Sequence, residues 1–153
     1  MIITLENAQK FNPSVTQEEL DGIEKAIRKE ANNPFQNLAA RFHQLIFENE
    51  NKIIVFDDVE GLRKGDTVQV SNSKWNDGLY VIESIEGNGI TLQGEPRLFS
   101  GSNKEAFITK VEYPADIIAG VQKLLQYDAQ MSGKMGLKSK TVSRMSETYF
   151  DQN

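Results

Sequence analysis

The chain offers few residues for acid–base or metal chemistry. His43 is its single histidine and it has no cysteine, so a metal site would depend on carboxylates and one imidazole. Asp57, Asp58 and Glu60 could in principle hold a hard cation, but they lack the ligand spacing of an EF-hand loop. We therefore expect His43 to be a packed or edge-strand residue and the carboxylates to be a solvated loop, with no metal and no cofactor.

No motif for a nucleophile or for a nucleotide phosphate is present. The serines do not fall in the Gly-x-Ser-x-Gly pattern of a nucleophile elbow, and the glycines form neither a P-loop nor a Gly-x-Gly-x-x-Gly motif. Gly65, Gly78, Gly87 and Gly89 are placed for turns instead. The sequence thus predicts no catalytic residues and favours a binding or assembly protein over an enzyme.

Lys74, Trp75 and Tyr80 are a possible contact surface. Exposed aromatic side chains with a nearby cation stack on the bases of single-stranded nucleic acids. The net charge of -5 and the pI near 5.0 supply few of the phosphate contacts that such binding uses. One hypothesis is a small-barrel adaptor that binds nucleic acid or protein through Trp75 and Tyr80; the structural alternative places Trp75 over the barrel end and Tyr80 in a strand.

A β module is predicted between two helical segments. Residues 38–47 could be a helix or a strand, since Leu38, Phe42, Leu45 and Ile46 have mixed spacing, and we favour the strand. Further short strands are predicted at residues 52–56, 66–70, 79–85, 90–93 and 105–111. These strands are enough to close into a small barrel or a tight sandwich.

Turn residues separate these strands. Asn76-Asp77-Gly78 predicts a tight turn, because Gly and Asn tolerate positive φ angles. The sequence also predicts a bulge near Ser84 and a turn at Gly87-Asn88-Gly89.

Helices are predicted on both sides of the β module. A short helix follows Thr4, and a capping box at residues 16–19 starts a longer helix that ends at Asn32-Asn33-Pro34. Pro114 is expected at the first position of another helix, with Asp116 near its positive end. We expect the two long helices to pack together.

The predicted fold class is α+β: a small helical bundle with an inserted antiparallel β barrel-like module and an extended C-terminal arm. The helical core takes residues 1–37 and 113–131, the β domain 38–112 and the arm 132–153. The arm is mildly basic, and its Ser/Thr content and alternation permit a strand that adds to a partner's sheet; a disordered terminus is the alternative. No stretch approaches the ~20 apolar residues that span a bilayer, so we expect no membrane contact.

Several segments together resemble the head-tail connector, or adaptor, proteins of long-tailed bacteriophages. The resemblance lies in Asn32-Asn33-Pro34-Phe35-Gln36, Gly65-Asp66-Thr67-Val68, Asn76-Asp77-Gly78-Leu79-Tyr80, Pro114-Ala115-Asp116-Ile117 and Gly136-Leu137-Lys138-Ser139-Lys140-Thr141-Val142-Ser143-Arg144. It is spread over most of the chain, and each segment has moderate specificity.

The resemblance implies a structural virion protein, made in the bacterial host cytoplasm and located at the head-tail junction. In this family a ring, commonly of twelve copies, sits under the portal protein, extends the DNA channel and offers a surface to the next neck or tail component. DNA passes through the lumen without sequence-specific binding. The family's C-terminal arm reaches the portal, which would assign that contact to Lys138, Lys140, Val142, Arg144, Tyr149 and Phe150.

Overall fold

A computed structural model describes residues 1–131 of the chain. Within them the chain forms three helices and six strands, an α+β composition. In chain order these are α1 (Leu5–Ala8), α2 (Gln17–Ala31), β1 (Gln36–Glu48), β2 (Lys52–Val55), β3 (Thr67–Ser71), β4 (Gly78–Glu86), β5 (Gly89–Leu92), β6 (Gly101–Val111) and α3 (Ala115–Gln130). The described residues divide into two compact units: Gln36–Glu112 forms one, and the residues before and after it form the other.

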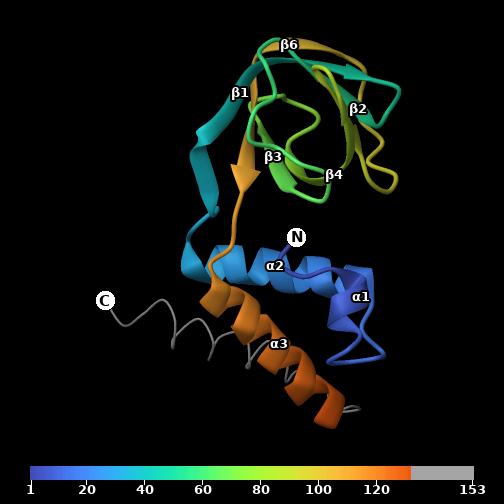
Figure 1. Ribbon diagram of the computed structural model, residues 1–153, viewed down its shortest axis with the longest axis vertical. Helices are drawn as coiled ribbons and strands as arrows, with labels where there is room; N and C mark the ends of the chain where they lie inside the picture. The colour runs from blue at the N-terminus through green and yellow to red at the C-terminus, as the bar shows by residue number, and fades with distance from the viewer. Residues whose placement is uncertain (132–153) are drawn as a thin grey trace. The chain divides into compact units, whose positions relative to one another are not determined.

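The strands of Gln36–Glu112 form a closed antiparallel barrel in the order β1-β2-β5-β4-β3-β6 (Figure 1). The predicted barrel and the strand at residues 38–47 are therefore confirmed. The inward side chains are apolar and buried; they include Phe42, Leu45, Ile53, Val68, Ile82, Ile90 and Ile108. Closure pairs every strand with two neighbours, so the barrel leaves no open sheet edge.

A bulge at Gln44 sets which β1 side chains face the core. Gln44 has a φ of 62°, and the pairing of β1 with β6 shifts between His43 and Leu45. Phe42 and Leu45 are consequently both buried although they are three residues apart. The predicted bulge near Ser84 is also confirmed, since the β4–β5 register shifts between Ile82 and Ser84.

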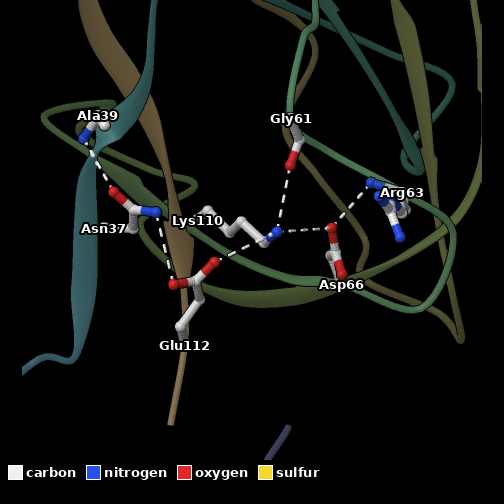
Figure 2. A network of polar contacts seen from close by, with 7 residues as sticks. All are labelled: Asn37, Ala39, Gly61, Arg63, Asp66, Lys110 and Glu112. Carbon is white, nitrogen blue, oxygen red and sulfur yellow. Dashed lines mark hydrogen bonds and ion pairs between the residues drawn. The ribbon is translucent and has the colours of Figure 1, made fainter. Parts of the chain in front are cut away.

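The Gly65-Asp66 motif forms the turn into β3. The Asp66 carboxylate accepts a hydrogen bond from Arg63 N at 2.8 Å, and it lies 3.5 Å from the Lys110 ammonium. Figure 2 shows Lys110 between this carboxylate and that of Glu112, which is 3.3 Å away. The motif therefore has a structural role in the barrel, where it joins the β2–β3 connection to the end of β6.

The helical unit follows the predicted capping signals in part. Thr16 Oγ1 accepts from Glu19 N at 3.2 Å at the start of α2, and Asn32 ends the helix with a left-handed φ of 50°. Pro114 differs from the prediction: it is the N-cap of α3, with extended backbone, and Ala115 is the first helical residue. Val121 of α3 and Leu20 of α2 line the same small pocket.

Candidate functional site

The β3–β4 loop, residues 72–77, carries two of the predicted contact residues. Trp75 is 68% exposed, and the ammonium of Lys74 lies 5.2 Å from the centre of its ring. Phe99, in the loop before β6, is 64% exposed and lies with its ring centroid 6.3 Å from that of Trp75. Trp75 and Phe99, called the aromatic pair below, form an apolar projection with a cation beside it.

Asn76 ties the two loops of the aromatic pair together. Its buried side chain donates from Nδ2 to the backbone O of Phe99 at 2.9 Å and accepts at Oδ1 from Phe99 N at 2.8 Å. The backbone N of Asn76 donates to Ser73 Oγ, which in turn donates to Asp77 Oδ1 at 2.6 Å. This network holds the backbone of both loops in place on either side of the exposed rings.

These bonds also correct a predicted turn. The sequence predicts a tight turn at Asn76-Asp77-Gly78, but Asn76 and Asp77 end a longer loop that begins after Ser71, and Gly78 is already the first residue of β4. The Asp77 carboxylate accepts from both the N and the Oγ of Ser73, and so closes the loop on itself.

Tyr80 has a different position from Lys74 and Trp75. It is half-buried on β4, and its hydroxyl donates to the backbone O of Asn76 at 2.6 Å. Burial, together with the charge of Asp77, raises the pKa of Tyr80 above the ordinary value of 10.0. Tyr80 is thus a neutral donor that supports the loop, while Lys74 and Trp75 present their side chains to solvent.

A groove of about 340 Å³ lies on the outside of the barrel beside Phe56. Apolar side chains of β1 and β2 form much of it, and Phe56 itself is 73% exposed. Its lining residues are Gln44, Leu45, Ile46, Ile54, Val55, Phe56, Asn88, Ser102, Asn103 and Lys104. We call it the Phe56 groove; its volume falls at the lower end of the range of small-molecule pockets.

The residues considered for metal chemistry are not gathered into a site. His43 is exposed on β1 with its ring centroid 5.7 Å from that of Phe107, and the Arg41 guanidinium stacks on the same phenyl ring at 4.0 Å. Asp57, Asp58 and Glu60 are exposed in the β2–β3 connection. Across residues 1–131, no three His, Asp or Glu side chains lie together as metal ligands would.

Glu24 organises the polar contacts of the helical unit. Its buried carboxylate accepts a hydrogen bond from the Tyr113 hydroxyl at 2.5 Å and lies 3.0 Å from the amino group of Met1. Arg28, one turn further along α2, donates to the backbone O of Pro34 at 2.6 Å and to the Tyr113 hydroxyl at 3.5 Å. Tyr113 is thereby fixed to α2 at the point where the chain re-enters this unit.

Replacing Tyr113 with phenylalanine should change how stability depends on alkaline pH. Burial, and then the hydrogen bond and charge of Glu24, raise the pKa of Tyr113 well above its ordinary value of 10.0. The folded state therefore keeps this proton when the unfolded state loses it, so the stabilisation is complete below pH 10 and is lost above it. We expect the free energy of unfolding to fall more steeply above pH 10 in the wild type than in Tyr113→Phe.

Urea titrations at several alkaline pH values measure this difference. The matched control is Tyr127→Phe, which removes a more exposed hydroxyl from α3 and should keep the wild-type slope. Parallel pH dependences for the wild type and Tyr113→Phe would contradict the assignment.

Comparisons with known proteins add no relative. A scan against protein-family models and a search of curated proteins both returned no match. No helix in residues 1–131 is long and apolar enough to cross a membrane. The predicted portal contacts Lys138, Lys140, Val142, Arg144, Tyr149 and Phe150 lie outside the described residues.

Proposed function

We propose that this chain is a structural virion protein that forms a ring, expected to hold twelve copies, between the portal of a phage head and its tail. The ring extends the DNA channel and offers a docking surface to the next neck or tail component. The distributed resemblance to head-tail connectors supports this proposal. The observation that carries it is that residues just before and just after the inserted barrel contact one another within the helical unit.

These contacts join residues that lie on either side of the insertion in the sequence. The rings of Phe35 and Tyr113 lie 5.0 Å apart, although the whole barrel separates them in the sequence. Asn33 Oδ1 accepts a hydrogen bond from Phe35 N at 2.7 Å, and the Arg28 guanidinium donates one to the backbone O of Pro34. The helical unit thus has its own continuous set of contacts, as expected for a connector core into which a β domain has been inserted.

The charge of the chain fits a conduit for DNA. The net charge is -5, while residues 132–153 carry four basic and two acidic side chains, so the acidic excess lies in residues 1–131. An acidic lumen repels phosphates and lets a genome pass, whereas a lining rich in Lys and Arg would retain it. The basic arm is then the part suited to reach an acidic or sheet-edge surface on the portal.

Removing Ser139–Asn153 tests the portal contact. We expect the truncated chain to fold and to fail in complementation of the phage, giving filled heads without tails and at least a hundredfold fewer infectious particles. Unchanged urea unfolding, followed through Trp75, is the control for folding. Normal tail joining by the truncated chain would contradict the assignment of the arm.

Alanine substitutions refine the same experiment. Tyr149→Ala with Phe150→Ala should reproduce the truncation, because aromatic side chains at a strand-addition site fill pockets on the partner. Replacing Gln152 and Asn153 with alanine is the matched control and should leave the titre unchanged.

A further inference from the structure

Residues 57–66 of the β2–β3 connection cover one end of the barrel. In the closed order β1-β2-β5-β4-β3-β6, two strands separate β2 from β3 in either direction, so the connection spans the barrel. Leu62, near its middle, is 7% exposed and belongs to the barrel core, and Val59 packs against that core. The connection therefore crosses the apolar interior at this end, and we call residues 57–66 the strap.

The two halves of the strap are held differently. Residues 57–60 include three exposed carboxylates, and the structure gives them no hydrogen bond or ion pair to any residue of the described range 1–131. In the second half, Gly65 N donates to Ile82 O at 2.8 Å, and Asp66 O accepts from Ile82 N at 3.0 Å. Segments with few contacts open locally while the rest of a domain stays folded. The strap is such a segment, set between two paired strands.

Lys110 of β6 fastens the middle of the strap (Figure 2). Its ammonium donates to the backbone O of Gly61 at 3.2 Å, directly before the buried Leu62. The same ammonium lies 3.5 Å from the carboxylate of Asp66 and 3.3 Å from that of Glu112, and both carboxylates are partly exposed. The two carboxylates fix the position of the ammonium, which in turn holds the backbone beside Leu62.

We propose that the strap is a conformational device that opens while the rest of the barrel stays folded, with Lys110 as its latch. Opening withdraws Leu62 from the core, breaks the hydrogen bond from Lys110 to Gly61 and exposes the apolar end of the barrel. Salt promotes opening, because it screens the partly exposed ion pairs that fix Lys110. The inference concerns the barrel alone and does not depend on the proposed ring.

Thiol labelling measures the opening, since the chain has no cysteine of its own. In full-length Leu62→Cys the thiol is covered by the closed strap and should react with N-ethylmaleimide only after the strap opens. Full-length Val70→Cys is the matched control, because Val70 is 1% exposed on β3 and becomes accessible only when the barrel unfolds. We expect Leu62→Cys to react faster by about tenfold or more, with a weaker dependence on urea because less surface is exposed. Equal rates with equal urea dependences would overturn the proposal.

Lys110→Met tests the latch. In the Leu62→Cys chain it should raise the labelling rate about fivefold, because it removes a charged hydrogen bond and two ion pairs. The matched control is Lys104→Met, which alters an exposed lysine on the same strand and should leave the rate unchanged. Sodium chloride at about 0.5 M should raise the rate of the Leu62→Cys chain only while Lys110 is present. Equal rates for Lys110→Met and Lys104→Met would overturn the assignment of the latch.

Hydrogen exchange tests the same opening without altering the strap. In the unsubstituted full-length chain, the amide of Gly65, bonded to Ile82 O, should exchange about tenfold faster than the amides of β3 in the closed sheet. Lys110→Met should accelerate the exchange of Gly65 further, and Lys104→Met should not. Exchange of Gly65 at the rate of the β3 amides would show that the strap opens only when the barrel unfolds, and would overturn the proposal.

Discussion

Replacing Ile82 with alanine is expected to lower the free energy of unfolding of the barrel by about 3 kcal/mol, within the range for truncating a buried aliphatic side chain and leaving a cavity. Ile82 is 0% exposed on β4 and belongs to the barrel core. It pairs across the sheet with Leu92 at the edge of the β4 bulge, where the backbone has little freedom to close over lost methylene groups. The variant should therefore lose the transfer free energy of the deleted carbon atoms and also the free energy that the remaining cavity costs.

Urea unfolding followed by fluorescence measures this loss, because the only tryptophan, Trp75, lies in the β3–β4 loop of the barrel unit. The matched control is Ile46→Ala on β1, whose side chain is 43% exposed and should lose less than about 1 kcal/mol. Similar losses at the two positions would contradict the barrel interior described above.

The second large effect is expected at Asn76. Asn76→Ala removes both hydrogen bonds to the backbone of Phe99 and leaves the part-buried N–H and C=O of Phe99 without this partner. A loss of about 2 kcal/mol is expected, since each of the two hydrogen bonds contributes roughly 1 kcal/mol to stability. The variant should also free the loops, so acrylamide should quench Trp75 with a higher rate constant.

Asn88→Ala is the control for this substitution. Asn88 is exposed in the β4–β5 turn, and truncating its side chain should change the free energy of unfolding by less than about 0.5 kcal/mol. Equal effects for Asn76→Ala and Asn88→Ala would show that Asn76 does not connect the two loops.

The β1 segment shows what the sequence could and could not predict. Strand-forming residues and the flanking turn signals indicated a strand, but the spacing of Phe42 and Leu45 also fitted a helix. The bulge at Gln44 explains this ambiguity, because it turns both side chains inward. A bulge that depends on a positive φ at a glutamine leaves no local sequence signal.

The candidate site was predictable only where its residues are neighbours in the chain. Lys74 and Trp75 stood out as a cation beside an aromatic residue, and the structure places both in one loop. Phe99 and the Asn76 bridge were missed, since a side-chain amide bonded to a backbone far along the chain has no sequence pattern. The Phe56 groove was missed for a similar reason: β1, β2, β6 and the β4–β5 turn all contribute to it.

Location in the particle tests the proposed function most directly. Density-purified phage from the source culture should contain this chain by mass spectrometry, at about the copy number of the portal protein. Gold-labelled antibody should mark the neck, between head and tail, in electron micrographs. Absence of the chain from complete particles, or label elsewhere on them, would contradict the connector function.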